Sequence, residues 1–106
     1  LFFRKDGILY SVDPQEIVYI ESIRHMLVIH TIREILEIPY ITLKEVLGEI
    51  NEYGFIQCRR NITVNRKYIA NIDTTNLYMC LAPGRIKVEI GRSYIKNIKA
   101  ALGVKS

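Results

Sequence analysis

The 106-residue sequence lacks long apolar runs, and we expect no leader segment in it. No stretch approaches the roughly 18 apolar residues that a membrane-spanning helix needs. The start, LFFRKDG, is charged by its fourth residue, so it does not read as a signal peptide. We therefore expect a cytoplasmic chain with one domain, residues 1–106, and one modest core. Because the sequence has no initiator methionine, we expect it to be an excised domain.

Cysteine is scarce, with only Cys58 and Cys80 in the chain. Their spacing fits no zinc motif, and two cysteines are too few for a disulfide scaffold. Each lies in an apolar stretch, where a free cysteine packs like a small hydrophobe. We predict two reduced, buried thiols. A redox effect on binding remains open for Cys58, because it adjoins a strongly basic stretch.

Catalytic motifs are also missing. The sequence has no glycine-rich phosphate loop, no nucleophile elbow and no paired carboxylates in an apolar stretch. His25 and His30 are five residues apart on a predicted strand, so their side chains would point to opposite faces and could not share a metal. We predict no enzymatic activity, no cofactor, no metal and no small-molecule substrate.

Charge is distributed unevenly along the chain. Residues 1–53 contain 5 Lys/Arg and 9 Asp/Glu, a net charge of −4, whereas residues 54–106 contain 10 and 2, a net charge of +8. With an overall pI near 9.2, this asymmetry predicts a surface that meets an anionic partner, and nucleic acid fits best. The alternative is a basic face that only keeps the protein in solution.

Most of the chain has the pattern of short β-strands. These segments are rich in Ile, Val, Leu and Tyr and are separated by turn residues. The predicted strands are residues 7–12, 16–22, 25–31, 34–39, 55–59, 68–73, 77–82 and 85–90. Strands in close succession with tight connections predict an all-β core of antiparallel hairpins rather than βαβ units.

Two segments have helical periodicity instead. Residues 42–54 begin with Thr42 and have Glu45 three positions later, which is the signature of a capping box, and Gly54 is a plausible end. Residues 92–102 place Ile95 and Ile98 on one stripe and basic residues on another. The second segment predicts a basic amphipathic helix of about three turns.

The most basic stretch is QCRRNITVNRKYI, residues 57–69, which contains four Lys/Arg and no acid. Arg59 and Arg60 are adjacent, so at most one can lie against a sheet and the other must project. We predict that residues 61–65 form a loop anchored by Ile62 and Val64 that carries Arg and Asn toward a DNA groove. The alternative is a solvated loop whose arginines pair with the acidic helix.

Arg92 lies at the expected start of the terminal helix. A cation there opposes the helix dipole by roughly 0.3–1 kcal/mol, which is better explained if an anion binds nearby, because helix N-termini favour phosphate. Lys96 and Lys99 continue the same face and could contact a phosphate backbone. The alternative is an ordinary hydrophilic helix surface.

The stretches DPQEIVYIESIRHMLVIHT, TLKEVLGEI, YGFIQCRRNITVNRKYIANID and RIKVEIGRSYIKNIKAAL resemble the LytTR-type DNA-binding domain of bacterial response regulators. The resemblance covers about residues 7–102. Its most specific part is F-x-x-x-x-R-[SN]-x-x-V-N-x-x-x-I, which is matched here by Phe55, Arg60, Asn61, Val64, Asn65 and Ile69. The family usually has His at Arg59 and Ser at Asn61, and often has Ser or Val at Gly91.

The resemblance implies a mostly β fold of about ten short strands in stacked antiparallel sheets, with one or two short helices. It also implies that loops, rather than a recognition helix, enter two successive major grooves. The family's base-contacting positions fall on His25, Arg60 and Arg92. Spacing alone predicts His25 to be a half-buried strand residue, whereas the resemblance places it in a turn.

The neighbours of these positions are expected to contact phosphates or flanking atoms; they are Arg24, Arg59, Asn61, Lys87 and Lys96. Asn65 could instead hold its loop through side-chain hydrogen bonds to the backbone.

We therefore predict sequence-specific binding of double-stranded DNA by the output domain of a two-component transcription regulator. A receiver domain absent from this sequence would drive dimerisation on paired or tandem sites. The alternative is a small β-rich interaction module whose basic face binds an acidic protein or a membrane surface. RNA binding fits less well, because the tyrosines are scattered among the predicted strands instead of forming stacking pairs.

Overall fold

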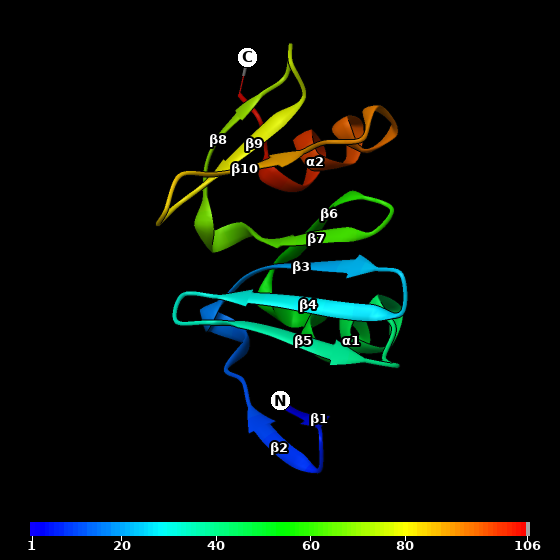
Figure 1. Cartoon of the computed structure of the whole chain (residues 1–106). Coiled ribbons are helices and arrows are strands. Elements are labelled where there is room, and N and C mark those ends of the chain that lie inside the picture. The colour runs from blue at the N-terminus through cyan, green and yellow to red at the C-terminus, as the bar shows by residue number, and fades with distance from the viewer. Residues whose placement is uncertain (106) are drawn as a thin grey trace.

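The computed structural model describes residues 1–105 and places ten strands there, in three antiparallel sheets (Figure 1). The strands are β1 (Phe2–Lys5), β2 (Ile8–Ser11), β3 (Ile17–Ile23), β4 (Met26–Thr31), β5 (Ile35–Pro39), β6 (Phe55–Arg59), β7 (Ile62–Asn65), β8 (Ile69–Asp73), β9 (Tyr78–Leu81) and β10 (Ile86–Glu89). The sheets have the strand orders β1-β2, β5-β4-β3-β7-β6 and β10-β9-β8. The predicted architecture is confirmed.

Two strands were not predicted. Strand β1 was missed because only Phe3 of its four residues is buried. Strand β7 was predicted to be an anchored loop, which is wrong. All four of its residues are buried, and it pairs with both β3 and β6 near the middle of the five-stranded sheet. A strand covered on both faces loses the alternation of polar and apolar residues that identifies strands in sequence.

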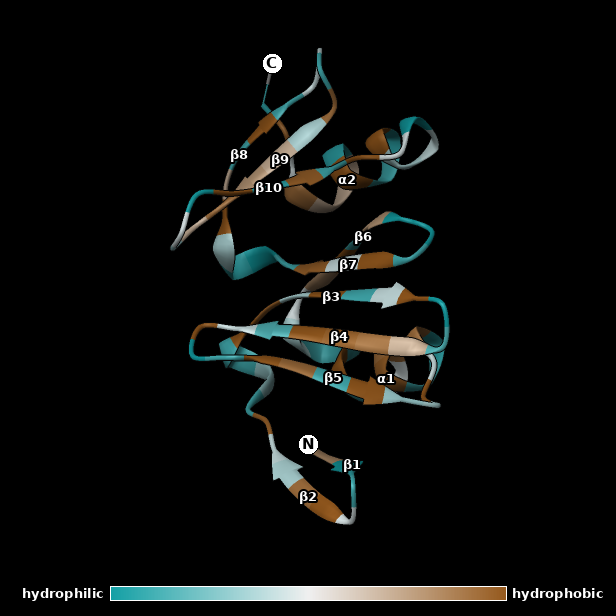
Figure 2. Cartoon of the chain, viewed as in Figure 1, coloured by the Kyte–Doolittle hydropathy of each residue, from teal (hydrophilic) through white to brown (hydrophobic). Residues whose placement is uncertain are grey.

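The buried side chains form two clusters on opposite faces of the five-stranded sheet. One cluster packs Ile20, Leu27 and Ile29 against α1 (Leu43–Ile50). The other packs Ile62 and Val64 of β7 against the β8–β10 sheet and α2 (Ile95–Leu102). Since neighbouring residues in a strand point to opposite faces, the short strands can contribute to both clusters. Figure 2 shows the apolar residues along the strands and on these helices.

Local signals explain most of the first helix. Thr42 and Glu45 form the capping box, with the Glu45 amide donating to Thr42 Oγ1 at 3.2 Å. The helix ends at Ile50 and continues as the 3-10 turn η2 (Asn51–Tyr53), after which Gly54 has a φ of +79°. That backbone angle favours glycine, so the predicted cap is confirmed.

The C-terminal helix begins later than its sequence pattern indicates. Residues Arg92–Tyr94 form the 3-10 turn η4, and the α-helix proper starts at Ile95. Ile98 is fully buried on its inner side. Within residues 1–105 neither helix is long and apolar enough to cross a membrane.

Candidate nucleic-acid interface

The first candidate segment is the tight turn between β3 and β4. It consists of Arg24 and His25, both of which are exposed. Arg24 has a φ of +57°, the left-handed conformation that two-residue hairpin turns require. The Tyr40 amide donates to the His25 carbonyl at 3.0 Å. His25 therefore lies in a turn with its side chain exposed, and the strand position inferred from spacing alone is wrong.

The second segment is the β6–β7 turn, formed by Arg60 and Asn61. Arg60 is exposed at the tip, and Gln57 Nε2 donates to its carbonyl at 3.0 Å. The Asn61 side chain points inward instead, where its Nδ2 donates to the Ser22 carbonyl at 3.1 Å. The Ser22 amide donates in return to the Asn61 carbonyl at 2.8 Å. This reciprocal pair connects the second turn to the end of β3, next to the first turn.

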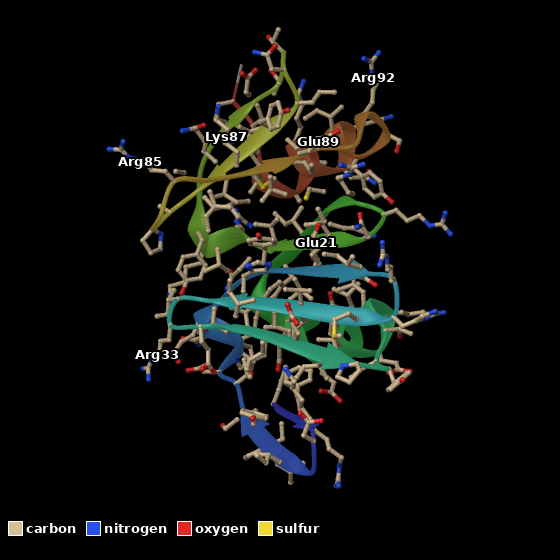
Figure 3. All side chains as sticks on the ribbon, viewed as in Figure 1. Glu21, Arg33, Arg85, Lys87, Glu89 and Arg92 are labelled. Atoms are coloured by element: carbon tan, nitrogen blue, oxygen red, sulfur yellow. The ribbon has the colours of Figure 1, made fainter. Side chains whose placement is uncertain are left out.

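The third segment is the start of η4, at Gly91 and Arg92. The Gly91 amide donates to the Cys58 carbonyl at 2.8 Å, which fixes the end of β10 beside β6. A Cβ atom at Gly91 would lie 3.0 Å from the Tyr94 ring, so the ring would have to shift to admit a larger residue. Arg92 is exposed and projects away from the domain (Figure 3).

These three segments, residues 24–25, 60–61 and 91–92, lie on the same side of the molecule, at the right in Figure 1. We call this side the contact edge. Its turns are hydrophilic (Figure 2), and the three segments contain no carboxylate. The hydrogen bonds at Asn61 and Gly91 fix the outer two segments to the central hairpin. The three expected base-contacting residues are thus brought to one edge.

The expected flanking residues differ in position. Arg24 and Lys96 are exposed beside the contact edge, on the first turn and on α2. Lys87 lies over the three-stranded sheet, with its Nζ atom 5.8 Å from the centroid of the Tyr78 ring, and Figure 3 places it apart from Arg92. Asn61 uses its side-chain amide inside the protein.

Arg59 forms an ion pair with an acidic side chain. Its Nη1 atom lies 3.0 Å from Glu89 Oε2 at the end of β10. A second ion pair joins Arg33 to Glu16 at 3.0 Å. Neither pair involves α1, so the alternative in which the basic stretch pairs with the acidic helix is wrong.

The basic stretch does not form a single cluster. Strand β7 separates Arg59 and Arg60 from Arg66 and Lys67, which lie in the 3-10 turn η3 (Arg66–Tyr68). Asn65, at the end of β7, is buried; its Nδ2 donates to the Ile17 carbonyl at 2.9 Å and its Oδ1 accepts from the Lys67 amide at 3.0 Å. The structural role considered for Asn65 is confirmed.

Both cysteines are free, but they differ in exposure. Cys58 is completely buried, and burial raises its pKa to about 12, so the thiol is neutral and poorly reactive. Cys80 is only half-buried, so the prediction of two buried thiols holds for Cys58 alone. Residues 1–105 contain no cluster of three side chains suited to holding a metal. His30 stacks on Tyr19 with ring centroids 3.9 Å apart, and burial lowers its pKa.

Sequence reasoning missed the residues that hold the contact edge together. Asn61 was expected to contact DNA, and Glu89 was not considered. Their partners are 39 and 30 positions away, respectively. The only available signal was indirect: Glu89 is one of two acids in the basic half of the chain.

Comparisons with known proteins found a matching family model, curated relatives and a similar solved structure. A model of the LytTr DNA-binding domain matches residues 7–103. The transcriptional regulatory protein LytR of Staphylococcus aureus, in strains N315 and NCTC 8325, is 26% identical over 101 residues, which is 93% of this chain and 41% of LytR. The chain thus spans about two fifths of the length of these relatives.

A similar solved structure is the LytTr DNA-binding domain of a putative methyl-accepting/DNA response regulator from Bacillus cereus. The TM-score is 0.79 at 20% identity, with 98% of this chain and 96% of the other covered. At that identity the match supports the fold.

Proposed function

Because the chain belongs to the LytTr DNA-binding domain family, we propose that it binds double-stranded DNA in a sequence-specific manner through its contact edge. His25, Arg60 and Arg92 would present their side chains to base edges. A guanidinium can donate two hydrogen bonds to guanine O6 and N7, and an imidazole can donate or accept one. The function is binding, without catalysis.

The observation that carries the proposal is that His25, Arg60 and Arg92 are exposed on three segments of one edge, and that these segments contain no carboxylate. The longest dimension of the molecule is 49 Å. Successive major grooves on one side of DNA are about 34 Å apart. An edge along the long axis could therefore reach two grooves. Turns rather than a helix form this edge, so loop readout is the natural mode.

Arg24 and Lys96, which are both exposed, would contact phosphates beside the reading residues. Lys87 is a weaker candidate because of its distance from Arg92 in Figure 3. Asn61 would act by holding the central turn in place through Ser22, rather than by touching DNA.

We further propose that the domain is the output part of a two-component transcription regulator. The supporting observations are the LytR relatives, which are named as transcriptional regulatory proteins and are about two and a half times as long as the matched region. A receiver domain outside this sequence would then bring two copies together on paired or tandem sites.

The test begins by selecting bound duplexes from random sequence and measuring affinity for the selected site by fluorescence anisotropy. Arg60→Ala and Arg92→Ala should each weaken binding by about 1–3 kcal/mol and relax preference at one base pair. Arg85→Ala is the matched control, because Arg85 is exposed but lies on the opposite side of the molecule (Figure 3). It should have little effect.

Two results would refute this assignment. If Arg60→Ala and Arg92→Ala weakened binding no more than Arg85→Ala does, the contact edge would not read bases. If the wild-type protein bound all duplexes equally and these complexes dissociated at about 150 mM salt, the basic surface would serve a non-specific interaction instead.

A further inference from the structure

The Arg59–Glu89 ion pair connects two of the three contact segments. Arg59 immediately precedes Arg60, and Glu89 lies three residues before Arg92. The pair spans from the end of β6 to the end of β10, beside the hydrogen bond from the Gly91 amide to the Cys58 carbonyl. Figure 3 shows Glu89 on the upper sheet and Glu21 below it. Arg59, Glu89, Glu21 and Lys87 line one hollow there.

This ion pair should contribute little to the stability of the fold. The side chains of Arg59 and Glu89 are 40% and 58% exposed, and ion pairs this accessible to water contribute little to folding. The two strand ends are already joined by the Gly91 hydrogen bond and by the buried cluster around Cys58, Val88 and Ile90. We therefore expect the pair to affect the charge of the surface more than the stability of the fold.

A free guanidinium at Arg59 would stand next to a base-reading residue. Phosphates are present at every base pair, so a cation that reaches one strengthens binding to any sequence and adds nothing to discrimination. In the structure, the Glu89 carboxylate forms an ion pair with the Arg59 guanidinium and offsets its charge.

We propose that Glu89 is a specificity-setting residue: it holds Arg59 on the protein and so limits sequence-independent binding. This inference rests on the proposed DNA-binding function. It assigns Arg59 a different role from the phosphate contact that the sequence indicates. Glu89 acts through Arg59 and does not itself touch DNA.

The test is Glu89→Gln, which keeps the shape of the side chain and removes its charge. Releasing Arg59 should tighten binding to an unrelated duplex on the order of fivefold at 0.1 M salt and steepen the log-affinity against log-salt slope by about 0.9. Binding to the selected site should gain less, so the ratio of the two affinities should fall. The melting temperature should remain close to that of the wild type, because the pair is exposed.

Two controls separate this mechanism from a general loss of negative charge. Glu21→Gln removes a nearby carboxylate for which no ion pair is found in residues 1–105, and it should give at most a small gain. In an Arg59→Gln background, Glu89→Gln has no cation to release, so its effect should disappear.

An equal gain from Glu21→Gln, or a gain that persists without Arg59, would overturn the role of Glu89. If the wild-type protein bound the selected site and Glu89→Gln changed neither affinity, the role of Glu89 would be overturned as well. The proposed function would remain intact. If the wild-type protein bound no duplex at all, both proposals would fail.

Discussion

Asn61 and Asn65 use their side-chain amides inside the protein. Asn61 bonds to Ser22, and Asn65 bonds to Ile17 and to the Lys67 amide. Buried backbone groups need hydrogen-bond partners, and these two amides supply them at the two ends of β7, where the chain turns. In sequence, an asparagine in a basic stretch is equally suited to reading adenine, so composition alone does not distinguish the two roles.

Thr63 differs from these two asparagines, because its side chain is buried without a hydrogen bond in residues 1–105. It is completely buried between the two asparagines, and its Oγ1 atom has no hydrogen-bond partner within residues 1–105. Thr63→Val keeps the shape and removes an unsatisfied hydroxyl, so it should raise the free energy of unfolding by about 1 kcal/mol. Urea denaturation followed by circular dichroism would measure the change.

Thr31→Val is the matched control for that substitution. The Thr31 hydroxyl accepts from the Glu34 amide at 2.9 Å and donates to the Glu34 carbonyl at 2.9 Å. Its loss should therefore destabilise the domain by about 1 kcal/mol. If both valine variants shifted stability in the same direction, the difference in hydrogen bonding would not be the cause.

Among the elements, the β6–β7 hairpin positions the others. Its strand β7 pairs with β3, its turn bonds to Ser22, and its Cys58 carbonyl accepts from the Gly91 amide. The hairpin thus contacts both neighbouring segments of the contact edge. Helix α1 lies on the far face of the five-stranded sheet, and its N-cap residue Thr42 lines a hollow with Arg24 and His25 of the first turn.

Asn61→Ala should therefore reduce both stability and specific binding. Losing the bond to Ser22 should cost about 1 kcal/mol of folding free energy, and the displaced turn should weaken binding to the selected duplex by roughly tenfold, since small misplacements of a reading loop are costly. Thr31→Val should cost a similar folding free energy of about 1 kcal/mol.

Because Thr31 lies at the opposite end of β4 from the first turn, its variant should keep wild-type affinity. Thermal unfolding and anisotropy on the same samples would separate the two effects. Equal affinities for the Asn61 and Thr31 variants would show that the bond to Ser22 has no role in positioning the turn.

On the scale of the whole molecule, the charge asymmetry of the sequence becomes an asymmetry between two ends. The acidic first half builds most of the cluster around α1, and the basic second half builds the β8–β10 sheet and α2. The contact edge runs between them, along a body 49 Å long. Its residues come from both halves, since Arg24 and His25 belong to the acidic one.

Lys96→Ala tests whether the basic end takes part in binding. Lys96 is exposed on α2, near the contact edge. Its removal should weaken all duplexes about equally and flatten the log-salt slope by about one unit. Arg85→Ala, on the side of the molecule opposite Arg92 (Figure 3), removes the same charge and should leave the slope unchanged.

A selective loss of affinity for only one sequence in the Lys96 variant would show base reading instead of a phosphate contact. An equal change of slope in the Arg85 variant would show that binding responds to net charge and not to position.

Local patterning determined much of this protein. Eight of the strands, the capping box at Thr42 and Glu45, and the cap at Gly54 follow from short-range periodicity and backbone preferences. Arg59 and Arg60 in succession required that one of them project, and Arg60 does. The family resemblance supplied what periodicity could not, namely the position of His25 in a turn.

Only the tertiary structure decided which side chains are available on the contact edge. The strand β7, the inward amide of Asn61 and the capture of Arg59 by Glu89 all depend on partners 30 or more residues away. A sequence fixes such contacts through the packing of the whole chain and leaves no local periodicity that marks them. Composition therefore revealed that the second half is cationic, and the fold selected which of its cations face outward.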